Sequence, residues 1–584
     1  MLFWFMTQTH DFGDSGLMGL YIRLIFGVYG MKKAGMLMPV FSLPGKYGIG
    51  TLGEEAYKFI DMLCDTGNKI WQVLPMGPTG FGDSPYQSFS AFAGNPYFID
   101  LQLLVKEGLL SVEELEEFDF GDGRVPDQYG GNPEDIQGDS PYKVNYGKLY
   151  ISKTKALKLA FEHYLKQGGD VSGLYEKLRP ETVEYCVFMA IKDSFKGASW
   201  DVWPRKFRNC DAKELELFRK THKEEIGFYA FLQYQFMKQW GKVHEYAKIR
   251  GIEIVGDIPI YCAPDSSDVW AHRELFQYTS DGEPKKVAGV PPDLFSATGQ
   301  LWGNPLYDWD MHEKTGYKWW LDRMDYCFEM FDILRVDHFR GFESYYSIPF
   351  GDKTAENGEW VKGPGMSLFD AMYEHYGTKK LPIIAEDLGI ITDEVRELMD
   401  KVGFPGMKVL QFAWDSGPEN AFLPNSLVTT NCIYYTGTHD NDTLRHWFDV
   451  LPDWQREYIY KYMSRSVNDW KAMPELLIRL AMSTISDTVI VPAADYLGHG
   501  SEGRINFPGT SGNNWMWRMK EGAFTDSIKG SIAEIVGVYG RYQKALPKPC
   551  PKPEAVTDTV QDEEKEDKPG AAPDSSADKE QDHD

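Results

Sequence analysis

Eight short apolar runs of strand length recur along the chain, and segments with helical periodicity lie between them. In residues 54–63, for example, Ala56, Phe59 and Leu63 fall on one face of a helix. Several runs are continuous rather than alternating, which is typical of parallel strands buried on both faces. The runs are 36–41, 70–74, 252–255, 333–336, 383–385, 408–412, 433–435 and 489–492. This alternation predicts an α/β fold, namely a (β/α)8 TIM barrel.

The spacing of the runs is uneven, because a long stretch separates the second run from the third. Helical patterns in residues 148–166, 180–194 and 213–250 predict that an inserted helical subdomain occupies about 102–250. A helix at 525–542 is the last ordered element that the pattern predicts. We therefore expect large helical insertions between the strands and no separate C-terminal β-sandwich domain.

Both ends of the chain differ from the barrel pattern. Residues 1–30 lack both the basic start of a signal peptide and the run of about 20 apolar residues of a membrane helix. We expect them to be an N-terminal extension that precedes a catalytic unit at 31–545. Residues 551–584 hold 12 acidic and 4 basic residues, a net charge of 4 − 12 = −8, with almost nothing apolar. This composition predicts an acidic, disordered tail at 546–584.

The overall charge and the cysteine count narrow the class of protein. The chain has 61 Lys and Arg against 87 Asp and Glu, a net charge of −26. This argues against nucleic acid and membrane surfaces as partners, because both require clustered basic residues. The seven cysteines include no CxxC pair, so neither a disulfide framework nor a Cys-based zinc site is expected, and a reducing, cytoplasmic compartment fits.

Aromatic residues make up 14% of the chain, and this high share is the unusual feature of its composition. Trp and Tyr rings present an apolar face together with a polar group, and they therefore suit surfaces that stack on sugars or bases. Most of these rings are nevertheless expected to be core. The negative charge opposes the nucleic-acid alternative.

Acidic, basic and imidazole side chains lie in or directly after four of the runs. In a barrel, the carboxyl ends of the strands are where catalytic groups are placed. The residues are Asp257 at the third run, Arg335, Asp337 and His338 at the fourth, Glu386 and Asp387 at the fifth, and His439 and Asp440 at the seventh. Several carboxylates on one rim match the two-carboxylate chemistry that cleaves glycosidic bonds.

Spacing within these motifs gives further constraints. Arg335 and Asp337 are two apart on a strand and share a face, so the arginine can hold the carboxylate in its ionised form. Glu386 and Asp387 are adjacent and point to opposite faces, and spacing alone leaves open which of them enters the site. A metal site near His439 is not expected, because no metal-ligand spacing accompanies it.

Long segments of the chain resemble the amylomaltase family, the 4-α-glucanotransferases of glycoside hydrolase family 77. The resemblance runs from about residue 34 to about residue 517, nearly all of the predicted ordered chain. The segments are MPVFSLPGKYGIGTLG, WQVLPMGPTGFGDSPYQSFSAFAGNPYFIDL, GDIPIY, GVPPDLFSATGQLWGNPLYDW, LRVDHFRG, AEDLG, TGTHDND and GRINFPGT.

The resemblance implies roles for individual residues. Asp337 would be the nucleophile, Glu386 the general acid/base, and Asp440 the third acid that stabilises the transition state. It thereby selects Glu386 over Asp387, and it implies a cleft-covering insertion at about 262–325. The implied substrate-binding residues are Ser84, Tyr86, Asn95, Asp257, Asp293, Gln300, Trp302, Asn304, Arg335, His338, His439 and Asn506.

The family resemblance also implies the reaction. The enzyme would transfer α-1,4-glucan segments between maltooligosaccharides or starch- and glycogen-derived glucans, as a monomer and without cofactor or metal. A retaining mechanism with a covalent glycosyl-Asp intermediate predicts carboxyl groups about 5–5.5 Å apart and a raised pKa for Glu386. An α-1,4-glucan hydrolase of the same clan would use the same acids. A non-catalytic glucan-binding protein would not need the complete acid set.

Overall fold

The fold is described from a computed structural model, which gives the arrangement of residues 32–80, 82–123, 140–279, 281–292, 296–510 and 512–542. The expected extension at 1–30 and the expected tail at 546–584 both lie outside these ranges. Within them, two β-sheets are present, one parallel and one antiparallel.

The parallel sheet contains eight strands in the order β10-β11-β12-β1-β2-β3-β6-β9. The sheet is nearly closed into a barrel, because the N–H of Ala385, the last residue of β9, donates to the Pro405 carbonyl before β10 at 3.0 Å. Its strands are β1 (Lys33–Leu37), β2 (Ile70–Gln72), β3 (Glu253–Ile258), β6 (Ile333–Val336), β9 (Ile383–Ala385), β10 (Gly406–Val409), β11 (Cys432–Tyr435) and β12 (Thr488–Pro492). The predicted (β/α)8 barrel is confirmed.

Each strand corresponds to one of the eight apolar runs, and two of the runs are displaced. The run at 36–41 contains the end of β1, but Pro39 has no N–H to donate and residues Val40–Ser42 form a 3-10 helix. The run at 408–412 likewise begins inside β10 and continues into a 3-10 helix at Leu410–Phe412. Both displacements occur where the chain leaves the barrel at the carboxyl end of a strand.

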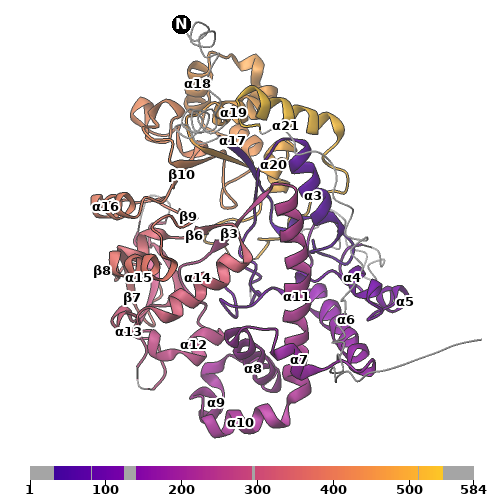
Figure 1. Cartoon of the computed structure of the whole chain (residues 1–584). Coiled ribbons are helices and arrows are strands. Elements are labelled where there is room, and N and C mark those ends of the chain that lie inside the picture. Colours follow the sequence, from indigo (N-terminus) through magenta and orange to yellow (C-terminus); the bar gives the residue numbers. More distant parts are fainter. Residues whose placement is uncertain are drawn as a thin grey trace, which may run out of the picture. The chain divides into compact units, whose positions relative to one another are not determined.

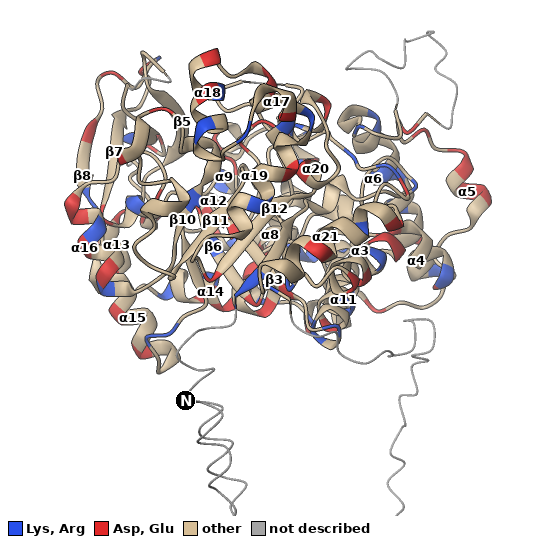
Figure 2. Ribbon diagram, turned by 90° about the horizontal axis from the view of Figure 1, so that it is seen from above, with Lys and Arg blue, Asp and Glu red and all other residues tan. Residues whose placement is uncertain are grey.

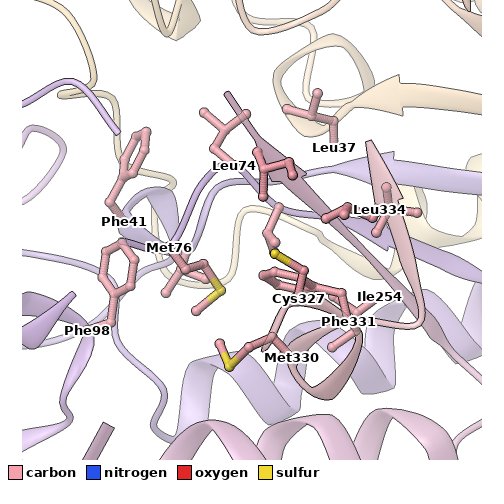
Figure 3. Close-up of a cluster of buried hydrophobic side chains, with 14 of the residues drawn as sticks. Leu37, Phe41, Leu74, Met76, Phe98, Ile254, Cys327, Met330, Phe331 and Leu334 are labelled. Carbon is pink, nitrogen blue, oxygen red and sulfur yellow. The ribbon is translucent and has the colours of Figure 1, made fainter. Parts of the chain in front are cut away.

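The hydrophobic core lies inside the barrel and between the barrel and its outer helices. Figure 3 shows part of this core, where Leu74, Ile254 and Leu334 of the barrel lie near Phe331 and Met330. All of these side chains are buried. Continuous apolar strands are required here because each strand packs against side chains on both of its faces.

Helices connect the strands and cover the outside of the barrel (Figure 1). Helix α3 (Glu54–Asp65) follows β1 and buries the predicted apolar face. The helices after β3 are α12 (Ser267–Ala271), α13 (Trp309–Lys314), α14 (Lys318–Met330), α15 (Met366–Tyr376), α16 (Asp393–Val402), α17 (Leu444–Val450), α18 (Asp453–Tyr462), α19 (Met473–Met482), α20 (Ala493–Tyr496) and α21 (Asp526–Val538).

The long connection between β2 and β3 is helical wherever the structure describes regular elements. Its helices are α4 (Leu101–Lys106), α5 (Val112–Glu116), α6 (Tyr146–Lys166), α7 (Val171–Tyr175), α8 (Pro180–Ser194), α9 (Arg205–Arg208), α10 (Ala212–Thr221) and α11 (Lys223–Ile249). The stretch predicted as helical at 213–250 is two helices, because the chain breaks at His222. Helices α6, α7 and α8 pack on α11, the long helix near the centre of Figure 1.

The second sheet is not predicted by the sequence pattern. It is antiparallel, in the order β5-β4-β7-β8, and lies at the left of Figure 1 with α15. Its strands are β4 (Lys286–Val290), β5 (Gln300–Pro305), β7 (Ser344–Pro349) and β8 (Glu359–Lys362). Strands β4 and β5 come from the connection after β3, and β7 and β8 come from the connection after β6. The sheet therefore joins two insertions, a pairing that no local pattern specifies.

Charged residues of both signs are interspersed along the outer helices of the described chain (Figure 2). None of the helices in these ranges contains an apolar stretch long enough to cross a membrane.

Arg541 connects the segment that follows α21 to the barrel. Its side chain is completely buried and donates to the carbonyl oxygens of Lys33, Met482, Thr484 and Ser486 at 2.9–3.2 Å. Lys33 begins β1, Met482 ends α19, and Thr484 and Ser486 lie between α19 and β12. One guanidinium thus satisfies backbone groups at the amino ends of two neighbouring strands.

Replacing Arg541 with Ala should lower the free energy of unfolding by about 3 kcal/mol, because buried carbonyls would lose their donors. Urea unfolding followed by Trp fluorescence measures this loss. Arg396→Ala is the matched control, since Arg396 is 61% exposed and its one ion pair among the described residues is with Asp393 on its own helix. It should change stability by less than about 0.5 kcal/mol. Equal losses in the two variants would contradict this structural role for Arg541.

Candidate active site

The polar residues predicted from the sequence gather at one end of the barrel. Asp257 lies in β3, Asp337 directly follows β6, and Glu386 directly follows β9. His439 and Asp440 lie in the connection after β11. Because the strands are parallel, their carboxyl ends form one rim, and these five side chains belong to that rim.

Arg335 is the cation at the centre of the rim. It lies on β6, is 4% exposed, and pairs in register with Asp257 on β3. Its Nη1 atom lies 2.7 Å from both carboxylate oxygens of Asp257, and its Nη2 atom lies 2.8 Å from Oδ1 of Asp337. The predicted proximity of Arg335 and Asp337 is confirmed.

The electrostatic environment keeps this arginine charged. Burial alone would lower the pKa of Arg335, but the carboxylates of Asp257 and Asp337 raise it well above its ordinary value. A permanent positive charge is therefore fixed beside Asp337, while Asp257 forms the other half of a buried ion pair.

Glu386 lies beside Asp337, and the structure distinguishes it from Asp387. The Glu386 carboxylate accepts hydrogen bonds from the backbone N–H groups of His338 at 2.8 Å and Leu388 at 2.7 Å. Asp387 instead accepts from the Met407 N–H on β10 at 2.6 Å. The ambiguity that spacing leaves open is thus resolved, because only Glu386 shares the surroundings of Asp337.

Glu386 is an acid that can hold its proton near neutral pH. Burial raises its pKa to about 7, and the negative charge of Asp337 acts in the same direction. The Arg335 charge and the two backbone N–H donors oppose this shift without cancelling it. These surroundings agree with the raised pKa expected for Glu386, and the group suits proton transfer at neutral pH.

His338 connects Asp337 to the second sheet. Its backbone is left-handed, with φ of 52°, an uncommon conformation for a residue other than Gly. Burial lowers the pKa of its imidazole to about 4, so the ring is neutral at pH 7. The ring packs edge-on against Trp302 of β5, with 4.9 Å between centroids. His338 thus places its N–H at Glu386 and its side chain against the second sheet.

A hydrogen-bonded chain links Asp257 to Asp440. The Tyr86 hydroxyl donates to Asp257 at 2.8 Å and lies 3.4 Å from Nδ1 of His439. Nε2 of His439 lies 3.3 Å from Oδ2 of Asp440. The Asn506 amide donates to Oδ1 of Asp440 at 2.7 Å. Residues from four separate segments are therefore joined around one rim.

The His439–Asp440 pair is held as an ion pair. Burial would lower the pKa of His439, but the adjacent carboxylate of Asp440 raises it above its ordinary value. Burial would raise the pKa of Asp440, and the charge and hydrogen bond of His439 together with the Asn506 amide outweigh it and lower the pKa. Asp440 therefore remains a carboxylate near neutral pH.

Other predicted contact residues make hydrogen bonds outside this network. The Ser84 hydroxyl accepts from the Tyr86 N–H at 3.3 Å, and Asn95 caps a 3-10 helix by accepting from the Tyr97 N–H. Their roles in binding substrate stay predictions.

Two of the predicted contact residues on β5, Asn304 and Gln300, also make hydrogen bonds outside the rim network. The Asn304 amide donates to the Cys262 carbonyl at 2.9 Å, and Gln300 accepts from the indole of Trp302 at 3.2 Å. Asp293 lies outside the described residues.

Two residues near the acids were not predicted. The Trp515 ring packs against Tyr86 and His439 at 5.9 and 5.8 Å between centroids. Arg504 donates to the backbone carbonyl of Asp440 at 3.4 Å and contacts the Asp442 carboxylate at 3.3 Å. Arg504 could have been found, because it stands in the GRINFPGT segment, whereas only the folded chain brings Trp515 to the rim.

A cavity of about 60 Å³ lies behind Tyr86 and Asp257. Its walls are mostly apolar and include Met76, Met330 and Phe331, and they do not include Asp337, Glu386 or Asp440. Among the described residues, His, Cys, Asp and Glu side chains form no cluster of three or more that could hold a metal ion.

A barrel with ionised and protonatable carboxyl groups on its carboxyl-end rim defines a class of enzyme that acts on glycosidic bonds. The sequence profile of the family described as 4-alpha-glucanotransferase, glycoside hydrolase family 77, matches residues 38–525. The chain therefore belongs to the 4-alpha-glucanotransferase family, and it is an enzyme of this type.

Individual relatives agree with this assignment. The 4-alpha-glucanotransferase of Clostridium butyricum is 43% identical over 511 residues, covering 86% of this chain and all of the relative. That of Thermus thermophilus is 43% identical, covering 84% and 95%. Among solved structures, the amylomaltase from Streptococcus agalactiae in complex with acarbose is 38% identical with a TM-score of 0.81, covering 88% of this chain and all of that one.

The raised pKa of Glu386 predicts how stability depends on pH. The folded-state pKa of about 7 lies above the unfolded value of 4.5, so the unfolded state loses this proton first as pH rises. The contribution of this group to the free energy of unfolding should fall by about 3 kcal/mol between those two pH values and then stay constant. Glu386→Gln should remove that part of the pH dependence.

Urea unfolding of wild type and Glu386→Gln at pH 5, 6, 7 and 8 tests this expectation. The amide faces two N–H donors and is expected to cost some stability at every pH. The informative quantity is therefore how the difference in free energy of unfolding between wild type and variant changes with pH. As pH rises, wild type should lose stability relative to the variant. A difference that is constant from pH 5 to 8 would refute the raised pKa.

Proposed function

We propose that the enzyme transfers α-1,4-glucan segments by a retaining double displacement with a covalent glycosyl-Asp337 intermediate. The observation that carries this proposal is the pairing of two carboxyl groups in different electrostatic states. Asp337 lies 2.8 Å from a permanently charged guanidinium, and the neighbouring Glu386 has a pKa of about 7. One group is thereby suited to attack and the other to donate a proton.

In the first step, a carboxylate oxygen of Asp337 attacks the anomeric carbon of the donor glucan. The bond from that carbon to the glycosidic oxygen breaks, and Glu386 gives its proton to this oxygen as the leaving glucan departs. In the second step, the 4-hydroxyl of an acceptor glucan attacks the glycosyl-enzyme, Glu386 takes the hydroxyl proton, and Asp337 is released as a carboxylate. The anomeric configuration is retained because it is inverted twice.

The other rim residues support these two steps. Asp440, held as a carboxylate by His439, would bind sugar hydroxyls and stabilise the positive charge that develops on the sugar ring. Arg335 fixes the orientation of Asp337, and the backbone N–H of His338 orients Glu386. The amylomaltase from Streptococcus agalactiae has been solved with acarbose, which supports maltooligosaccharides and related α-1,4-glucans as substrates.

Incubation with maltotriose tests the reaction and the nucleophile together. Wild-type enzyme should produce glucose with a ladder of longer and shorter glucans while the number of glycosidic bonds stays constant. Asp337→Asn should lower the rate by at least about 10⁴-fold, because the covalent step is lost. A steady rise in reducing ends would indicate the hydrolase alternative, and full activity of Asp337→Asn would contradict the assignment of the nucleophile.

Trp302 is proposed to favour an acceptor glucan over water. It lies on β5 at the edge of the second sheet, half-buried, and its ring contacts His338 beside the nucleophile. An apolar ring there would restrict the approach of water to the intermediate. The sequence also suggests Phe295, in the same cleft-covering insertion, for this role, but Phe295 lies outside the described residues.

Trp302→Ala should therefore raise the ratio of hydrolysis to transfer several-fold, measured as reducing ends released per glucan transferred. Trp360→Ala is the matched control, because Trp360 is on β8 at the opposite edge of the same sheet and is 40% exposed. The control should leave the ratio unchanged. An unchanged ratio in Trp302→Ala would count against a water-excluding role.

A further inference from the structure

Asp440, the third acid of the proposed mechanism, lies on a loop with few large apolar side chains. Residues 436–444 connect β11 to α17 and carry His439 and Asp440. The sequence of this loop, TGTHDNDTL, is mostly small and polar, and the Asp440 side chain is 46% exposed. The position of Asp440 must therefore come from hydrogen bonds rather than from packing of large side chains.

One buried carboxylate holds both ends of this loop. Asp495 lies on α20, immediately after β12, and is 4% exposed. Its Oδ2 atom accepts from the Thr436 hydroxyl at 2.7 Å, and its Oδ1 atom accepts from the Leu444 N–H at 2.7 Å. Thr436 directly follows β11 and Leu444 begins α17. A single group on the neighbouring strand connection thus spans the whole loop.

We propose that Asp495 is a positioning residue for glucan transfer, which fixes Asp440 by holding the two ends of its loop. This inference rests on the proposed function, in which Asp440 stabilises the transition state. Asp495 does not belong to the rim itself, and it acts through the backbone of the loop.

Hydrogen bonds within the loop show how the constraint reaches Asp440. The Asn441 side chain accepts from the Thr438 N–H at 2.8 Å, and the Thr438 hydroxyl accepts from the Asp440 N–H at 3.3 Å. The Gln411 amide donates to the Asp442 carbonyl at 2.8 Å. Two of these bonds lie within the loop and the third joins it to the segment after β10, so the middle of the loop is held by hydrogen bonds, and Asp495 holds its two ends.

The surroundings of Asp495 leave little space for an alternative arrangement. A cavity of about 10 Å³, no larger than one water requires, is lined by Asp495 together with residues in the middle of the loop. The charged or titratable groups lining it besides Asp495 are His439, Asp442 and Arg504. If the loop lost its hydrogen bonds to Asp495, no ordered water cluster could replace them without moving the loop.

Both protonation states of Asp495 can hold the loop. Burial raises its pKa to about 7, with the negative charge of Asp442 adding to the shift. The ionised form accepts both hydrogen bonds, whereas the protonated form accepts from the Leu444 N–H and donates to the Thr436 hydroxyl. Asn, with one acceptor oxygen and one amide NH₂, reproduces the second pattern. An Asn at this position is therefore expected to retain the constraint.

The first test compares Asp495→Ala with Asp495→Asn in maltotriose disproportionation. Asp495→Ala should lower kcat by about 10–100-fold, because a displacement of about 1 Å at a catalytic group has an effect of this size. Its KM should change by less than about threefold, because the lost interaction acts in the transition state. Asp495→Asn should restore kcat to within about fivefold of wild type. A rise in KM with unchanged kcat would overturn the proposal.

Asp332→Ala serves as the control for losing a hydrogen-bonded carboxylate that is only partly exposed, at 21%. Asp332 precedes β6 at the opposite end of the barrel and accepts from the Ile254 N–H at 2.9 Å and from His244. This variant should lose stability, measured by thermal unfolding, while its kcat stays within about twofold of wild type. An equal fall in kcat in Asp332→Ala and Asp495→Ala would show a general structural effect and overturn the proposal.

A double-mutant cycle separates this proposal from the function on which it rests. If Asp495 acts through Asp440, Asp495→Ala should reduce kcat much less in an Asp440→Asn enzyme than in wild type. Equal reductions in both backgrounds would overturn the positioning role alone. Wild-type kcat in Asp440→Asn would overturn the role of Asp440 and this inference with it. Should Asp495→Ala fail to fold, Thr436→Val, which removes one of the two hydrogen bonds, replaces it in the same cycle.

Discussion

The structure of the active site depends on one buried cation, Arg335. Its guanidinium lies between Asp257 and Asp337 inside the barrel, where an unpaired charge would be strongly unfavourable. The arginine therefore fixes the position of both carboxylates, and Asp257 in turn fixes the Tyr86 hydroxyl. From Tyr86 the polar contacts continue through His439 to Asp440. A planar group with several donors can organise this rim, whereas a lysine could not donate in two directions from one rigid plane.

The acidity proposed for Glu386 and the stability of the folded chain conflict. Its carboxyl group is buried near Asp337, which disfavours ionisation and supplies the protonated acid that glycosidic chemistry requires. The same burial makes the folded state less stable once the proton is lost. Such a group persists because backbone donors at His338 and Leu388 hold it in place. The unusual backbone of His338 is thus part of the acid's support.

The large aromatic content serves the core more than the rim. Trp71, Trp200, Trp240, Trp320 and Trp414 are among the largest fully buried side chains. A smaller set, which includes Trp302, Trp515 and Tyr86, contacts residues of the rim. Composition could show only that aromatic residues are abundant. Which of them face the site depends on insertions that bring distant segments together, as the second sheet does for Trp302.

The sequence by itself indicated the barrel, because eight short apolar runs that alternate with helical patterns are typical of parallel strands buried on both faces. It also located the acids, since motifs at the ends of parallel strands must meet on one rim. Spacing left the choice between Glu386 and Asp387 open, and the family resemblance selected Glu386. The tertiary structure gave the physical reason, because it places Glu386 with the charges of Asp337 and Arg335 and places Asp387 on the Met407 N–H of β10. The antiparallel sheet, the packing of Trp515 and the contact of Asp495 with the loop at 436–444 were decided only by the tertiary structure. Each joins segments far apart in the chain, and local periodicity carries no information about such pairings.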